Sequence, residues 1–497
     1  MKIMYKNKTY IVLLLLGLAA LAQSCNKWLD VQPSTQTTEE KQFSSEQGYK
    51  DALIGIYQKM AQLNSYGKEL TYGCLDVLAQ IYQNKANANT DTYGQMARYN
   101  YTDATVKATL SSLWSTQYST IAQANYLLKD VDADKGLFSG INYQLVKGEA
   151  LAARALLHFD LLRLFASAPA ASAEVDDKAI PYMLAFAVNP GKALNRSEVL
   201  GLVEKDLKEA ESLLQVYPDI DQIKDNASNT SLEVFTMFRQ NRLNVWAVRA
   251  LLARVYLYQG NKAEALKYAK AVIDSQKFEF VNGNTNSVSA ASATSNAIFS
   301  TEHIFSIYKS NLKDISDRYF KTEAGAAENE DLFTTLTNLN SWYEVSVAGH
   351  AIDIRGPQAS SSRWNQFNAN TVYNTKYYVG NNVTNVNQKL VPVIKLSEMY
   401  YIAAEASETI DQALIYLNKV RAARLIPALS TSSVNTTALL ETELFKEYRK
   451  DFYAEGQLWF YYKRKNYSTL QNTVGGTMDN TKYVFPLPDN EIEFGLN

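Results

Sequence analysis

The segment RLNVWAVRALLARVYLYQGNKAEALKYAKAVID, which begins at Arg242, limits the fold of this chain more than any other feature. Apolar residues recur at helical spacing on both sides of Gly260 and Asn261, which predicts two helices joined by a tight turn. Small residues such as Ala265 and Ala269 lie where the helices would cross, so the helices can approach closely. One helical pair cannot bury its apolar face alone, and we therefore expect it to pack against further helices.

The layout of this pair is similar to that of a tetratricopeptide repeat. A looser copy, VIKLSEMYYIAAEASETIDQALIYLNKVRAARL, begins at Val393. Apolar stripes predict two more pairs, residues 44–63 with 114–131 and residues 145–165 with 197–215. We therefore expect a mostly α fold with about four discontinuous tetratricopeptide-type helical hairpins as its scaffold. Long insertions separate the hairpins, which argues against a plain solenoid.

Two of the insertions are polar and rich in aromatic residues. The composition of residues 66–103 favours loops and turns. Residues 281–390 are rich in Asn, Ser, Thr and Gly, with few helical stripes. Because a structureless loop of this length is uncommon inside a compact protein, we expect a large irregular lobe that carries short helices and strands.

The N-terminal residues have the order of a signal peptide, with lysines before an apolar run at about residues 11–21 and small residues after it. The run is little more than half of the roughly 20 residues that a spanning helix needs. Cys25 directly follows the small residues, which resembles the lipobox of bacterial lipoproteins, although Ala22 stands where that pattern prefers Leu. We expect cleavage after residues 1–24 and acylation of Cys25, which would anchor the protein durably; simple secretion is the alternative.

Composition excludes several classes of function. Three histidines lie far apart and the chain has two cysteines, so neither a zinc site nor a disulfide framework fits. We expect no metal and no cofactor, and we interpret Cys74 as a small buried hydrophobe. The formal net charge of −2, with scattered charges, lacks the basic footprint of a nucleic-acid-binding protein.

Three carboxylates are candidates for a catalytic group. Glu447, Asp451 and Glu455 recur every four residues on one predicted helix face, and paired carboxylates can hydrolyse glycosidic bonds. Lysines and an arginine are interspersed with them, so we interpret this face as solvated or salt-bridged. We therefore expect no catalytic residue.

Aromatic residues make up 12% of the chain, and two clusters combine them with amide and charged side chains. Aromatic rings stack on the CH faces of sugars, and polar side chains beside them hydrogen-bond the hydroxyl groups. Packing within the protein is the alternative for each ring. The candidate ligand-binding residues are Tyr82, Asn84, Tyr93 and Arg98 in the first cluster, and Trp342, Tyr343, Arg363, Trp364 and Asn365 in the second.

Several segments, taken in their order along residues 25–497, resemble the SusD/RagB family of outer-membrane nutrient-binding lipoproteins. Each segment alone is weak evidence, and the resemblance rests on their order along the chain. The segments are SCNKWLDVQP, WSTQYSTIAQANYLL, GEALAARALLHFDLLRLFA, KLSEMYYIAAEA, EYRKDFYAEGQLWFYYKRKN and YVFPLPDNEIEFGLN.

The resemblance implies a protein that is lipid-anchored in the outer membrane and faces the cell exterior. It would capture an oligosaccharide and sit on a SusC-like TonB-dependent transporter, with its ligand site on the lobes between the hairpins. Capture of a peptide, as in some members, is the alternative, and a surface glycoside hydrolase is a third hypothesis.

The expected organisation follows from these segments. It comprises a signal peptide (1–24), a lipidated strap (25–40), an N-terminal region with three hairpins and the polar lobe 66–103 (41–280), an irregular lobe that is the candidate ligand-binding region (281–390), a fourth hairpin (391–425) and a C-terminal SusD/RagB region (426–497).

Overall fold

The computed structural model describes residues 39–88, 90–169, 176–186, 191–216, 234–236, 239–284, 296–320, 331–359, 362–368, 370–377, 389–470 and 474–494. The expected signal peptide and Cys25 lie outside the described residues. The chain divides into two compact units, residues 1–49 and 50–497. The helices of the described residues include none with the length and apolar character of a membrane span.

In the first unit, the described residues form α2 (Glu39–Gln42) and the start of α3 (Glu46–Met60), which continues into the second unit. The side-chain amide of Gln42 donates to the carbonyl oxygen of Gly48 at 2.9 Å. The rings of Phe43 and Tyr49 lie 4.7 Å apart. These contacts close the turn between the two helices.

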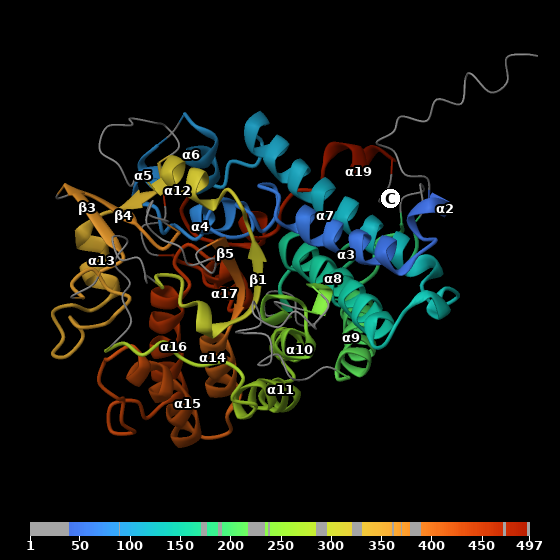
Figure 1. Ribbon diagram of the computed structural model, residues 1–497. Coiled ribbons are helices and arrows are strands. Elements are labelled where there is room, and N and C mark those ends of the chain that lie inside the picture. The colour runs from blue at the N-terminus through green and yellow to red at the C-terminus, as the bar shows by residue number, and fades with distance from the viewer. Residues whose placement is uncertain are drawn as a thin grey trace, which may run out of the picture. The chain divides into compact units, whose positions relative to one another are not determined.

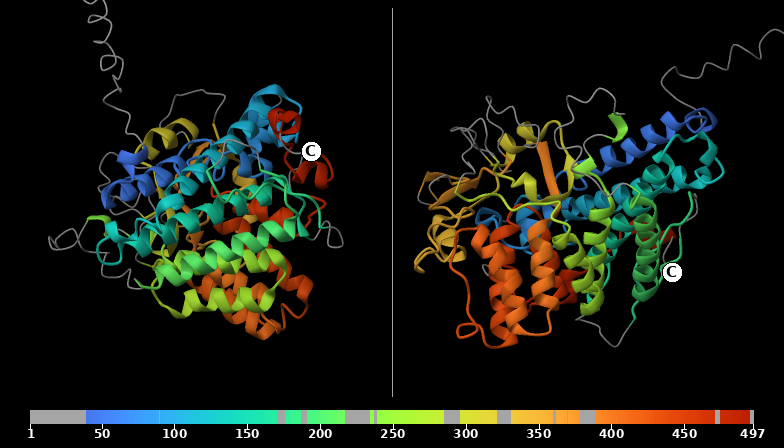
Figure 2. Two further views of the ribbon diagram at one scale, coloured as in Figure 1. Left: turned by 90° about the vertical axis from the view of Figure 1, so that its right-hand side faces the viewer. Right: turned by 60° about the horizontal axis from the view of Figure 1, so that its bottom comes forward.

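The second unit has a row of packed helices as its scaffold (Figures 1 and 2). Three helical pairs are in contact, and α7 packs on α8, α9 on α10, and α11 on α14. The mostly α-helical fold is thereby confirmed, whereas the tetratricopeptide identity of the pairs stays a prediction. The helices of the row are α7 (Ala104–Asp130), the pair α8 (Asn142–Phe165) and α9 (Arg196–Leu214), the pair α10 (Val245–Gln259) and α11 (Lys262–Asp274), and the pair α14 (Leu396–Ala406) and α15 (Ile410–Ala423).

The α10–α11 pair forms as its sequence predicts. The side chain of Asn244 caps α10 by accepting from two main-chain N–H groups of the first turn. Gly260 ends the helix with φ of 79°, a left-handed conformation that glycine adopts at low cost. Asn261 caps α11, and Ala265 and Ala269 are fully buried at the crossing.

The described parts of the segment 281–390 contain short strands and helices, in agreement with the expected lobe. Strand β1 (His303–Tyr308) pairs with β5 (Leu390–Lys395) in an antiparallel sheet. A second antiparallel sheet has the order β2–β4–β3, formed by β2 (Phe333–Thr334), β3 (Trp364–Asn368) and β4 (Thr371–Asn374). The helices of this lobe are α12 (Leu312–Phe320) and α13 (Leu336–Trp342).

The polar segment 66–103 contains turns and three short helices, α4 (Cys74–Leu78), α5 (Gln83–Asn87) and α6 (Thr92–Ala97). Most of its described residues are buried, and many of their main-chain groups hydrogen-bond within the segment. Cys74 is a buried free thiol, as predicted, and burial raises its pKa.

A buried charge cluster lies around α16 (Thr437–Asp451) and the turn that leads into α17 (Gln457–Arg464). Arg355 donates to Glu447 at 2.8 Å, and Arg424 donates to Glu302 through both terminal nitrogens at 2.6 Å. The cluster comprises Glu302, Asp353, Arg355, Lys376, Lys395, Arg421, Arg424, Glu447, Lys450, Asp451 and Glu455, none more than 2% exposed.

Glu447, Asp451 and Glu455, the candidate catalytic carboxylates, belong to this cluster. They are ion-paired, as one of our interpretations held, but they are not solvated. Burial would raise the pKa of Glu447, but Arg355, Lys450 and Arg421 outweigh that effect and lower the pKa to about 2. Glu447 is therefore ionised in the folded protein.

We expect Glu447→Gln to lower the free energy of unfolding by about 3–5 kcal/mol, because it leaves buried cations without their carboxylate. The matched control is Glu264→Gln, which removes an exposed pair with Lys267 at 2.9 Å and should cost ~0–1 kcal/mol. Denaturant titrations of both variants measure the difference. Equal losses would show that the buried pairs do not hold the fold.

A second prediction concerns acid stability. Burial lowers the pKa of His158 to about 3 and that of His303 to about 4, from an ordinary value of 6.5. The unfolded chain therefore binds more protons below pH 6.5, and each histidine should lower the free energy of unfolding by roughly 1 kcal/mol per pH unit. Burial raises the pKa of Asp76, which acts on the pH dependence of stability in the opposite sense.

Stability measured between pH 7.5 and 5 should decrease toward acid, and His158→Gln should flatten this dependence. The native imidazole accepts from the main-chain N–H of Met183 at 3.0 Å through Nε2, a bond that protonation removes. If His158→Gln keeps the full pH dependence, the loss of stability in acid does not arise from His158.

Candidate ligand-binding face

Tyr453, in the turn between α16 and α17, is the centre of an aromatic cluster. Its ring centroid lies 4.7 Å from that of Trp364, 5.7 Å from that of Tyr82 and 6.2 Å from that of Trp342. The ring of Tyr343 lies 6.2 Å from Trp364. The structure therefore brings four of the sequence-predicted residues together from both predicted clusters, with Tyr453 between them.

The polar atoms of this cluster are also used within the protein. The indole N–H of Trp364 donates to the carbonyl oxygen of Arg355 at 2.7 Å, and the Tyr343 hydroxyl donates to that of Lys450 at 3.0 Å. These bonds hold the rings against the buried charge cluster. Six predicted residues are at most 9% exposed, namely Tyr82, Tyr93, Trp342, Tyr343, Arg363 and Trp364.

The remaining residues of the first predicted cluster have local structural partners. Asn84 hydrogen-bonds two main-chain groups beside the start of β2, at 2.6 and 3.2 Å, and so joins α5 to the sheet. The Tyr93 hydroxyl donates to the Glu69 carboxylate at 3.0 Å. Arg98 donates to the carbonyl oxygen of Gly94 within α6 at 3.0 Å. Asn84 and Arg98 are half-buried.

Arg363 lies under the start of β3 and positions that strand. It is 1% exposed, donates to the carbonyl oxygen of Ala297 at 3.3 Å, and its guanidinium carbon lies 5.1 Å from the centre of the Phe299 ring. A cation over an aromatic face is a stabilising contact. Arg363 therefore fixes the end of the strand that Trp364 begins.

Strand β3 presents the exposed part of the predicted site. Asn365 is exposed, and so are Gln366, Phe367 and Asn368, with 57% of Phe367 accessible. The strand lies at the edge of the described sheet, and Trp364 at its start is buried. The register shifts between Gln366 and Asn368, and side chains on both faces of this edge strand are exposed after Trp364.

Sequence reasoning missed Phe367 and its two amide neighbours. A signal was present in the segment WNQFN, because alternation from a buried Trp364 places Asn365 and Phe367 on the opposite, outward side of a strand. Of the nine predicted residues, Asn365 is the exposed one. Whether any of the nine contacts a ligand stays a prediction.

The end of β4 is fixed to the turn around Tyr453. The Lys376 ammonium donates to the carbonyl oxygen of Tyr453 at 2.6 Å and to Glu455 at 2.5 Å. Burial lowers the pKa of Lys376 to about 7, an effect that Glu455 only partly opposes. The Tyr377 hydroxyl donates to the carbonyl oxygen of Ala454 at 2.7 Å. The sheet under the exposed side chains is thus attached to the buried charge cluster.

Glu447, Asp451 and Glu455 are each ion-paired with buried cations and are at most 2% exposed. Over the part of the chain that the structure describes, no group of three or more His, Cys, Asp or Glu residues is placed to hold a metal ion.

Two family models match the chain, one described as "Starch-binding associating with outer membrane" over residues 27–257 and one described as "SusD family" over residues 258–494. SusD-like protein P38 of Formosa agariphila is 23% identical over 97% of this chain and 96% of that protein. SusD-like protein P25 of the same organism is 23% identical over 68% of this chain, and the match spans 58% of that protein.

Solved structures share the fold. A SusD superfamily protein from Bacteroides thetaiotaomicron has a TM-score of 0.70 at 16% identity, with 91% of this chain and 97% of that chain covered. A SusD-like carbohydrate binding protein from Bacteroides vulgatus has a TM-score of 0.67 at 17% identity, with 90% and 96% covered.

Proposed function

The chain belongs to the SusD/RagB family, and we propose that it captures an oligosaccharide at the cell surface and delivers it uncleaved to a SusC-like TonB-dependent transporter. The observation that carries the binding proposal is the exposed row of side chains on β3. There an aromatic ring with 57% of its surface accessible stands among three amide side chains.

These side chains suit a sugar better than a charged ligand. The Phe367 ring offers apolar area to the CH face of a pyranose, and each amide has both donors and acceptors for hydroxyl groups. The strand is held from below by Trp364, whose ring packs on Tyr453. A rigid face loses little conformational entropy when it binds, which favours affinity.

The proposal places the protein on the outer membrane, with lipid on Cys25 and the ligand face outward. The family description of starch binding and outer-membrane association supports this location. The lysines, the short apolar run and the small residues before Cys25 support the lipid anchor. The enclosure of Glu447, Asp451 and Glu455 in ion pairs supports binding without cleavage.

Peptide capture is the second candidate, and the edge position of β3 favours it. An extended peptide can add a strand to a sheet edge through main-chain hydrogen bonds. Probing an array of soluble oligosaccharides and peptides, with analysis of products, separates the hypotheses. We expect oligosaccharide binding without products. Products would contradict a binding role, and binding of peptides alone would contradict the sugar assignment.

We expect Phe367→Ala to weaken binding of an oligosaccharide found on the array by roughly 10- to 100-fold, since burial of one aromatic ring contributes ~1.5–3 kcal/mol. The matched control is Phe186→Ala, which removes the same side chain at a similar exposure of 55% elsewhere on the surface. Isothermal titration calorimetry measures both affinities. An unchanged affinity for Phe367→Ala would place the ligand elsewhere.

The lipid anchor predicts a mature protein that begins at Cys25 and has the added mass of acyl chains. Intact-mass spectrometry of the membrane fraction measures both properties. Cys25→Ser should release the protein from the detergent phase in phase partitioning. A mature protein without acyl mass would support simple secretion instead.

A further inference from the structure

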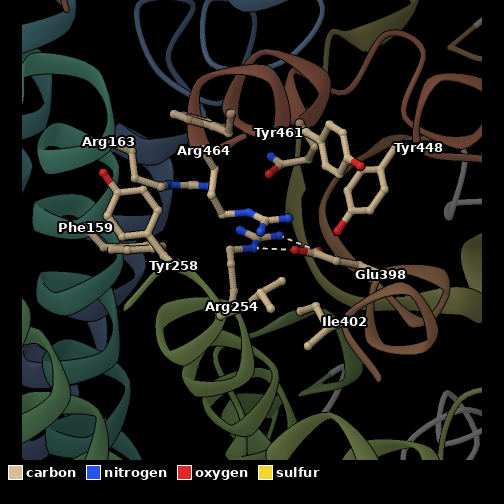
Figure 3. A pocket seen from close by; sticks show the side chains of 12 residues that line it. Phe159, Arg163, Arg254, Tyr258, Glu398, Ile402, Tyr448, Tyr461 and Arg464 are labelled. Carbon is tan, nitrogen blue, oxygen red and sulfur yellow. Dashed lines mark hydrogen bonds and ion pairs between the residues drawn. The ribbon is translucent and has the colours of Figure 1, made fainter. Parts of the chain in front are cut away.

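A small cavity of about 30 Å³ lies among the helices, away from β3. Its lining comes from five helices and includes Arg163 of α8, Arg254 of α10, Glu398 of α14, Tyr448 of α16 and Arg464 of α17. Figure 3 shows the guanidinium groups of Arg254 and Arg464 close together in the middle of this space, with that of Arg163 to one side of them. Like charges so close together are unfavourable unless negative charge lies between or beside them.

Two of the arginines each donate to both oxygens of a carboxylate. Arg254 donates to both oxygens of Glu398 at 2.6 Å, and Arg464 donates to those of Glu405 at 2.6 and 2.7 Å. These bidentate pairs fix the guanidinium planes. They also direct the remaining N–H groups of the two arginines away from the carboxylates.

The third arginine lies beside a buried lysine. Arg163 pairs with Asp160, and next to it lies Lys463, which is 1% exposed and donates to the carbonyl oxygen of Leu164 at 3.1 Å. Burial and the neighbouring Arg163 lower the pKa of Lys463 well below its usual value, so Lys463 adds little positive charge. Three guanidinium groups therefore stand against three carboxylates, Glu398, Glu405 and Asp160.

Hydrogen-bond donors at the cavity wall point to the kind of ligand. Nη1 of Arg254 and Nε of Arg163 are buried, and they have no acceptor among the described residues. The same holds for the hydroxyl groups of Tyr258 and Tyr461, which also line the space. The two guanidinium nitrogens can only donate, whereas a tyrosine hydroxyl can donate or accept. The two buried guanidinium N–H groups therefore lack an acceptor.

We propose that this cavity binds a monoatomic anion such as chloride, held by Arg254 together with Arg163 and Arg464. The volume of the cavity corresponds to roughly one or two water molecules, which suits a halide ion. An anion accepts charge-assisted hydrogen bonds from the guanidinium groups, which are stronger than the bonds that a neutral water molecule would accept.

The ion would join the two matched regions of the chain. Arg163 and Arg254 lie within residues 27–257, whereas Glu398, Tyr448 and Arg464 lie within residues 258–494. A ligand that binds the folded state alone stabilises it in proportion to the logarithm of its concentration above the dissociation constant. The melting temperature should therefore rise with halide concentration.

Crystals soaked in sodium bromide test the site directly through anomalous diffraction at the bromine edge. We expect a peak in the cavity within contact distance of Nη1 of Arg254. In parallel, the Tm should be higher in sodium chloride than in sodium gluconate at equal ionic strength. No bromide peak in the cavity, together with equal Tm values in the two salts, would overturn the proposal.

Two arginine variants of α10 provide the matched comparison. Arg254→Lys keeps the charge but removes the planar donors, and it should abolish the difference in Tm between chloride and gluconate. Arg249→Lys alters a pair with Glu211 at 2.8 Å and should retain the difference. An unchanged halide effect in Arg254→Lys would contradict the site. If that variant does not fold, the bromide map of the wild-type protein decides.

Discussion

The ion pairs of the buried charge cluster fix the turn between α16 and α17, and the ligand face depends on that turn. Glu447 is paired with Arg355 and Asp451 with Arg424, all without access to solvent. Such pairs add little net stability over apolar packing, but removing one partner is costly, so they favour a single arrangement of the segments that they join. The pairs connect α16 to the end of α15, to the start of β1 and to the irregular segment at Arg355. A lobe with short strands is thereby held in place by charge as well as by packing.

From this turn the structure extends outward to the proposed binding site in three layers. The charge cluster holds the main chain around Tyr453, and the Tyr453 ring contacts Trp364, Tyr82 and Trp342. Trp364 begins strand β3, whose following side chains are exposed. The aromatic residues thus have two separate roles. Buried rings set the position of the strand, and we propose that the exposed Phe367 ring meets the ligand. This division explains how a lobe of irregular structure can present a rigid surface.

The sequence predicted the helical scaffold well because its signals are local. The caps at Asn244 and Asn261 and the turn at Gly260 are readable within one segment. The site could be predicted only in part, because its contacts join residues that are distant in sequence. Arg355 and Glu447 are separated by 92 positions, and nothing near either residue identifies the other. A mixture of Tyr, Trp and Asn suits both a binding surface and a core that contains polar groups. Composition therefore could not show that Trp342 is buried and Phe367 is exposed. Strand alternation from the buried Trp364 was the signal that places Phe367 on the outward side.

The account depends most on the location of the ligand, and a crystal structure with a bound oligosaccharide tests that location directly. The proposed function predicts a sugar ring stacked on Phe367, with hydroxyl groups within hydrogen-bond distance of Asn365, Gln366 or Asn368. The aromatic cluster beneath should keep the arrangement around Tyr453 that is described above. A sugar bound at another surface, with β3 uncovered, would contradict the account.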